Sequence, residues 1–86
     1  MSRRKHITRL LNADLIFERS IRVLDYSFRE GVHGEFMVMH GCYILTGHEF
    51  EIIIIDKRIV ENLRALGELK NVAIKVDDFG NITLLS

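Results

Sequence analysis

The sequence predicts a small α+β domain, with a mainly antiparallel sheet of four to five strands, an N-terminal helix and a second helix at about residues 57–66. Residues 35–56 contain two long apolar runs on either side of Thr46-Gly47, which is the pattern of a β-hairpin. An amphipathic segment then follows Asp56 and ends at Gly67. With 86 residues, the chain is expected to form one domain with a small core.

The first ten residues are basic, although the whole chain has no net charge. They contain four of the twelve basic residues, Arg3, Arg4, Lys5 and Arg9, and none of the twelve acids. The remaining chain therefore has eight basic and twelve acidic residues. Four cations at a helix N-terminus would oppose the helix dipole. We therefore divide the chain into a basic N-terminal arm, residues 1–6, and a single α+β domain, residues 7–86.

Residues 7–30 fit two structures. A helix would align apolar side chains at spacings of seven, four, three and four residues, and Gly31 would end it: Leu10, Phe17, Ile21, Leu24 and Phe28. A strand would use the alternation of Leu24, Tyr26 and Phe28. We predict a helix from Ile7 to at least Arg19, and we prefer its continuation to Arg29 over a first strand at 21–29.

The central hairpin is apolar on both faces. In its first strand one face carries Phe36, Val38, His40, Cys42 and Ile44, and the other carries Met37, Met39, Tyr43 and Leu45. In its second strand Phe50, Ile52 and Ile54 alternate with Glu51, Ile53 and Ile55. Strands that are apolar on both faces are usually covered on both. Gly41, between the two rows, predicts a bulge or a close backbone approach.

The C-terminal third alternates helix, strand, turn and strand. Asp56 is a good helix N-cap, and Gly67 is a natural left-handed stop. The buried side of this helix is expected to carry Ile59, Val60, Leu63 and Leu66. Residues 72–76 read as a strand, residues 77–80 as a turn, and residues 82–85 as the last strand.

If residues 21–29 form a strand instead of a helix, the order becomes three strands, a helix and two strands. That order resembles the oligonucleotide/oligosaccharide-binding (OB) barrel, or more loosely an SH3-like barrel. The resemblance lies in element order alone and involves no residue motif. The alternative fold is therefore a small OB-like or SH3-like β-barrel.

The sequence contains no pattern typical of an active site or a cofactor site. His33, His40, Cys42 and His48 fall within sixteen residues, but their spacing matches no zinc motif. Cys42 lies mid-strand in an apolar row, where burial raises rather than lowers a thiol pKa. We expect no catalytic residue, no metal, no cofactor and no enzymatic activity.

Protein binding is the function that the composition favours. The apolar fraction is 48%, which is high for a domain with so little interior. We expect part of that surface to form an interface, most simply in a homo-oligomer, and its residues to be Met37, Met39, Tyr43, Ile53 and Ile55. A regulatory protein with an unknown protein partner fits this reading, and the small, motif-free chain is compatible with a phage or mobile-element protein. The single cysteine indicates a reducing, cytoplasmic compartment.

The alternative function is nucleic-acid binding to DNA or RNA. The basic arm would neutralise phosphates, and arginines interleaved with aromatic residues would contact bases. The residues of this alternative are Arg3, Arg4, Lys5, Arg9, Arg22, Tyr26 and Arg29. No run of about 18 apolar residues exists, so we expect no membrane-spanning segment. The basic start is followed by no apolar stretch typical of a secretory signal.

Overall fold

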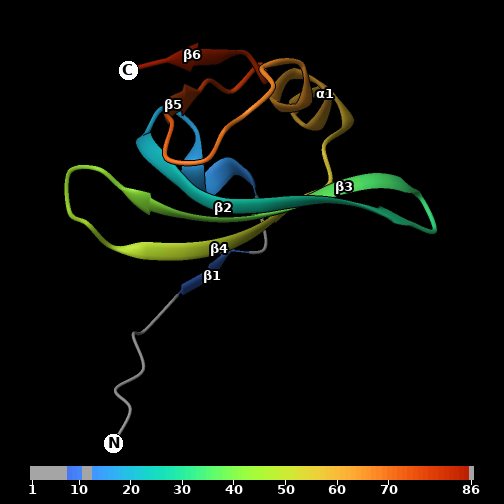
Figure 1. Ribbon diagram of the computed structural model, residues 1–86, viewed down its shortest axis with the longest axis horizontal. Helices are drawn as coiled ribbons and strands as arrows, with labels where there is room; N and C mark the ends of the chain where they lie inside the picture. Colours follow the sequence, from blue (N-terminus) through green and yellow to red (C-terminus); the bar gives the residue numbers. More distant parts are fainter. Residues whose placement is uncertain (1–7, 11–12, 86) are drawn as a thin grey trace, which may run out of the picture.

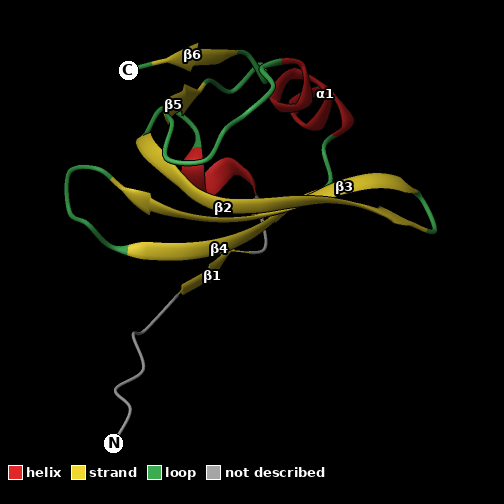
Figure 2. Cartoon of the chain, in the orientation of Figure 1, coloured by secondary structure: helices red, strands yellow, loops and turns green. Residues whose placement is uncertain are grey.

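The computed structural model describes residues 8–10 and 13–85. Within these residues the chain forms a mixed sheet of six strands, one α-helix and one short 3-10 helix (Figures 1 and 2). The strands are β1 (Thr8–Leu10), β2 (Ser20–Gly31), β3 (Gly34–Tyr43), β4 (Glu49–Ile54), β5 (Ala73–Val76) and β6 (Ile82–Leu84). The helices are η1 (Ala13–Ile16) and α1 (Lys57–Ala65). The predicted α+β class fits. The described residues differ from the prediction in having one α-helix instead of two, and six strands instead of four to five.

The strands lie in the order β1-β4-β3-β2-β5-β6. Neighbours pair in antiparallel fashion except β1 and β4, which are parallel, with Thr8 opposite Phe50. In Figure 1, α1 lies beside the β5–β6 hairpin, on the opposite side of β2 and β3 from β1 and β4. One face of the sheet is therefore turned toward α1 and the other is turned away from it.

The central hairpin was predicted correctly in its position. β3 and β4 pair from Met37 opposite Ile54 to Cys42 opposite Glu49. Its turn comprises residues 44–47 and is longer than the expected Thr46-Gly47 pair. Within it, the amide of Gly47 donates a hydrogen bond to the carbonyl of Tyr43. Gly47 has a φ of 75°, a conformation that side chains with a Cβ rarely adopt.

The predicted N-terminal helix is wrong. Residues 8–10 are a strand, residues 13–16 are a single 3-10 turn, and residues 20–31 form the longest strand of the sheet. A bulge explains the error: Val23 lies opposite Gly41 and Asp25 opposite His40, so Leu24 is an extra residue. The inward row is therefore 21, 23, 26 and 28. Because of the extra residue, Ile21 and Phe28, which are seven residues apart, point to the same face, as they would on a helix.

The helix at residues 57–66 is confirmed as α1. The Asp56 carboxylate accepts hydrogen bonds from the amides of Arg58 and Ile59, as an N-cap does. Gly67, with a φ of 83°, follows the last turn. Ile59, Val60 and Leu63 are buried as predicted, whereas Leu66 is 38% exposed.

The last hairpin is also as predicted, with β5 and β6 joined by a turn at residues 77–80. The Asp77 carboxylate accepts hydrogen bonds from the amides of Asn81 and Phe79, each 2.9 Å long. These bonds favour the charged carboxylate and hold the pKa of Asp77 below its ordinary value, with the amide of Asn81 as the largest cause.

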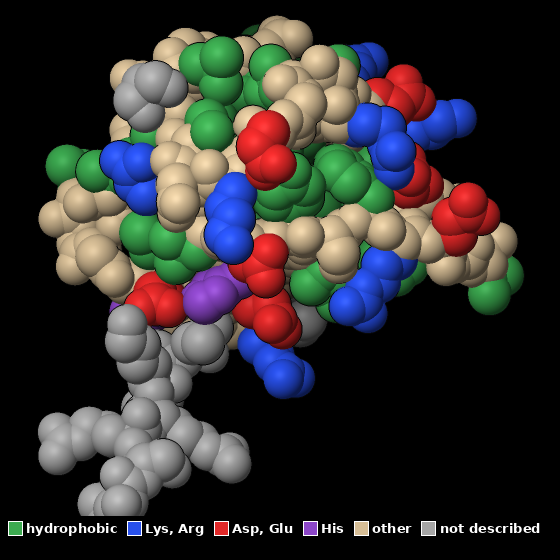
Figure 3. Space-filling model, viewed as in Figure 1, with side chains coloured by type: hydrophobic (Ala, Val, Ile, Leu, Met, Phe, Trp, Pro, Cys, Tyr) green, Lys and Arg blue, Asp and Glu red, His purple; other side chains and the backbone are tan. Residues whose placement is uncertain are grey.

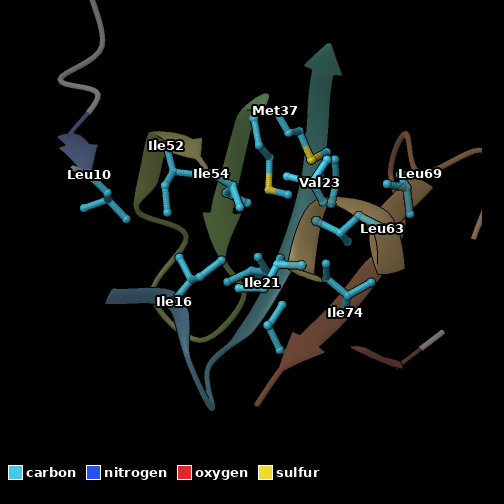
Figure 4. Packing of buried hydrophobic residues seen from close by; sticks show 14 of the residues in the cluster. Leu10, Ile16, Ile21, Val23, Met37, Ile52, Ile54, Leu63, Leu69 and Ile74 are labelled. Atoms are coloured by element: carbon cyan, nitrogen blue, oxygen red, sulfur yellow. The ribbon is translucent and has the colours of Figure 1, made fainter. Parts of the chain in front are cut away.

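The core lies between the sheet and α1. Figure 4 shows Met37, Ile52 and Ile54 of the central hairpin pointing toward Val23 of β2 and Leu63 of α1. Met37, Met39, Phe50, Ile52 and Ile54 are completely buried. Gly41 makes room for one of them, because a Cβ at Gly41 would lie 2.9 Å from Cζ of Phe50 and 2.9 Å from the carbonyl oxygen of Arg22. The expected close approach at Gly41 is thus present.

Tyr26 connects β2 to the segment that follows α1. Its hydroxyl donates to Glu68 Oε1 at 3.1 Å and accepts from the amide of Leu69 at 3.2 Å. The amide of Lys70 also donates to Glu68, at 3.1 Å. The Lys70 amide and then the Tyr26 hydroxyl hold the pKa of Glu68 below its ordinary value.

The element order proposed for the barrel alternative is present, since β2, β3 and β4 precede α1, and β5 and β6 follow it. Among the described residues, however, no pairing between β6 and β4 closes these strands into a barrel. The predicted basic arm, residues 1–6, lies outside the described residues.

Candidate protein interface

The face of the sheet turned away from α1 carries a mixed set of side chains. Directly opposed residues of an antiparallel pair point to the same face, so the register assigns each side chain to a face. We call the side turned away from α1 the outer face. Its residues are Arg9 of β1, Arg22, Asp25, Ser27 and Arg29 of β2, Phe36, Val38, His40 and Cys42 of β3, Glu49, Glu51 and Ile53 of β4, and Ile55 just after it.

Four apolar side chains are adjacent on the outer face, at the end near the β2–β3 turn. Val38 lies opposite Ile53, and Phe36 and Ile55 continue the same two rows. Ile53 is 46% exposed and Ile55 is 77% exposed, while Phe36 and Val38 are half-buried. We call Phe36, Val38, Ile53 and Ile55 the apolar patch.

The apolar patch continues into a hollow at the β2–β3 turn. This hollow, of about 630 Å³, is lined by residues 31–36 and Ile55. Val32 stands at its rim with 97% of its surface exposed. This end of the outer face therefore combines the apolar patch with an adjoining hollow.

The rest of the outer face is polar, and much of it is paired within the chain. His40 Nε2 lies 2.9 Å from Glu49 Oε1, and Arg9 Nε lies 3.6 Å from Glu51 Oε1. Asp25 and Arg29 are exposed on β2, and neither forms an ion pair with another of the described residues. The space-filling view shows charged side chains of both signs between apolar ones, with a histidine beside acidic side chains (Figure 3).

The interface residues expected from the sequence do not share one surface. Met37 and Met39 lie opposite Ile54 and Ile52 and are completely buried beneath α1. Ile53 and Ile55 lie on the outer face. The expected grouping is wrong because opposed residues share a face, which places the odd-numbered methionines with the even-numbered isoleucines. Tyr43 lies on the inner side, with its ring 4.8 Å from that of Phe50.

The residues expected to bind nucleic acid are also dispersed. Arg22 and Arg29 lie on the outer face, but Tyr26 lies on the inner face, where its hydroxyl is bound to Glu68. Arg22 donates to the carbonyl of Asn71 at 2.7 Å, and Arg9 lies beside Glu51. Arg3, Arg4 and Lys5 lie outside the described residues.

Among residues 8–10 and 13–85, no three His, Cys, Asp or Glu side chains gather in a way that could hold a metal ion. The free thiol of Cys42 is half-buried on the outer face. In the same part of the chain, α1 is too short and too polar to cross a membrane.

Comparisons with protein-family models, with curated proteins and with solved structures give no match for this chain.

Proposed function

We propose that this chain is a non-enzymatic binding protein, that it acts through protein–protein contacts, and that it self-associates through its outer face. The observation that supports this most strongly is the apolar patch, since Ile53 and Ile55 are exposed beside Phe36 and Val38. Adjacent exposed apolar side chains on a sheet face mark an interaction surface more often than isolated ones do.

The charges of the outer face favour a second copy as the occupant. The described part of this face carries three arginines, Arg9, Arg22 and Arg29, and three acids, Asp25, Glu49 and Glu51. A balanced face can meet its own copy around a two-fold axis.

The size of the face sets the strength of the contact. Four strands at a spacing of about 4.8 Å, over about six residues of about 3.3 Å each, cover about 19 × 20 Å. This projected area of about 400 Å² is below the roughly 800 Å² per partner typical of a stable complex. We therefore propose a dimer that forms and dissociates with concentration, as suits a regulatory protein.

The proposed location is the cytoplasm, where a thiol such as Cys42 stays reduced. Nucleic-acid binding by the basic arm with Arg22, Tyr26 and Arg29 is not the function that we favour, because Tyr26 is on the opposite face from both arginines.

Size-exclusion chromatography with light scattering, over a concentration series, tests the proposal. The wild-type mass should rise toward twice the chain mass of 10.0 kDa. Ile53→Glu should keep the mass at the monomer value, because it places a charge in the apolar patch. Phe79→Glu is the matched control, since Phe79 is 69% exposed in the β5–β6 turn and should leave the dimer intact. A wild-type chain that stays monomeric at all concentrations would contradict self-association.

A further inference from the structure

A second hollow lies at the far end of the β3–β4 hairpin from the apolar patch. It has a volume of about 560 Å³ and is lined by Glu18, Arg19, Ser20, Tyr43, Leu45, Thr46 and His48. We call it the Tyr43 pocket. Volumes of about 300–1,000 Å³ are typical of small-molecule sites. Since Tyr43 lies opposite Ile21 on the inner side of the sheet, the pocket is separate from the outer face.

Two aromatic rings of the pocket are nearly parallel. The rings of Tyr43 and His48 lie at an interplanar angle of 15°, with centroids 6.5 Å apart. Tyr43 is fixed in place, because its ring contacts Phe50 and its hydroxyl donates to the carbonyl of Leu15 at 3.2 Å. His48 is held by Thr8, whose Oγ1 lies 2.7 Å from Nε2 of the imidazole. A flat ring parallel to both would meet surfaces that are already oriented for stacking.

A cation lies over the face of the Tyr43 ring. The guanidinium carbon of Arg19 lies 5.4 Å from the centroid of Tyr43. No carboxylate among the described residues forms an ion pair with Arg19, whereas Glu18 lies 3.8 Å from Lys75. The Arg19 side chain is exposed and can turn toward an anion, and the hydroxyls of Ser20 and Thr46 add hydrogen-bonding groups.

From this arrangement we infer that the Tyr43 pocket binds a nucleotide, with the base stacked on Tyr43 and His48 and the phosphate at Arg19. Base–aromatic stacking combined with an arginine is a common way to hold single-stranded nucleic acid without sequence preference. The same chemistry serves a free nucleotide or one nucleotide of a strand. These residues differ from the arm and the Arg22–Tyr26–Arg29 set that the sequence suggested.

Titration of the ¹⁵N-labelled full chain, followed by amide chemical shifts, tests the inference. One arm uses uridine monophosphate, and the other uses a twelve-residue oligothymidylate. Binding should move the amides of residues 18–20 and 43–48 in at least one arm. Saturation by the mononucleotide with no tighter binding of the strand identifies a free-nucleotide site. Tighter binding of the strand identifies a single-strand path.

Variants separate this site from adventitious binding. Arg19→Ala removes an exposed side chain and should weaken binding at least about fivefold. Lys57→Ala, which removes the same charge at the start of α1, should leave the affinity unchanged. The inference is overturned if neither ligand moves residues 18–20 and 43–48 at millimolar concentration, or if Arg19→Ala and Lys57→Ala bind equally well.

Discussion

The tight contact at Gly41 leads to a quantitative prediction about the core. In Gly41→Ala, the new methyl group would lie 2.9 Å from the carbonyl oxygen of Arg22 and 2.9 Å from Cζ of Phe50. The carbonyl belongs to the paired strand β2, and the ring is completely buried, so neither can move freely. Overpacking of this kind costs about 1–3 kcal/mol. In a domain of this size, each kcal/mol lowers the melting temperature by about 4–8 °C.

Gly31→Ala is the matched control for this prediction. There the new methyl group would lie 3.2 Å from Cε1 of Phe36, a half-buried side chain at the exposed end of β2. We expect a change of less than about 0.5 kcal/mol, as for most surface substitutions. Thermal melts followed by circular dichroism measure both variants. If Gly41→Ala melts within about 2 °C of the wild type and of Gly31→Ala, the described approach of Phe50 to the β3 backbone is wrong.

Three further predictions concern the hydrogen bonds of the fold. Asp56→Ala removes the N-cap of α1 and should lower the free energy of unfolding by about 0.5–2 kcal/mol in urea titrations, whereas Asp56→Ser should retain most of it. Tyr26→Phe leaves the Leu69 amide without its hydroxyl acceptor and should lower the free energy of unfolding by about 1 kcal/mol. An unchanged urea midpoint would show that the hydrogen bonds of the Tyr26 hydroxyl do not stabilise the fold. Glu68 and Asp77 have lowered pKa values in the folded state, so their contribution is present above their ordinary pKa values and is lost as pH falls through the folded ones. Melting temperatures from pH 7 to 2 should therefore fall less in Glu68→Gln/Asp77→Asn than in the wild type, and parallel curves would contradict this.

Elements with local signals could be predicted from the sequence. The cap at Asp56, the stop at Gly67 and the apolar runs around Thr46-Gly47 locate α1 and the central hairpin, because each depends on neighbouring residues. β2 could not be located in this way. Its bulge at Leu24 shifts the alternation by one residue, and its pairing with β3 and β5 outweighs the helix-forming tendency of its sequence.

The surface that we propose as an interface could have been located more closely from the sequence. The two apolar rows of the central hairpin predicted that both of its faces are covered, whereas Ile53 and Ile55 of the second strand are exposed within the chain. Whether the turn has two residues or four, even-numbered residues of the first strand lie opposite odd-numbered residues of the second. Val38 therefore shares a face with Ile53 in either case. The Tyr43 pocket had no such signal, because Arg19 and His48 are 29 residues apart and meet through the β2–β3–β4 ladder.

The proposed site of self-association is tested most directly by amide chemical shifts of the wild-type chain over a dilution series. Dissociation should move the amides around Phe36, Val38, Ile53 and Ile55 together, with one dissociation constant, and leave those of α1 and β6 in place. A series in which the mass falls while the moving amides lie in α1 or β6, or in which no amide of the apolar patch moves, would contradict self-association through the outer face.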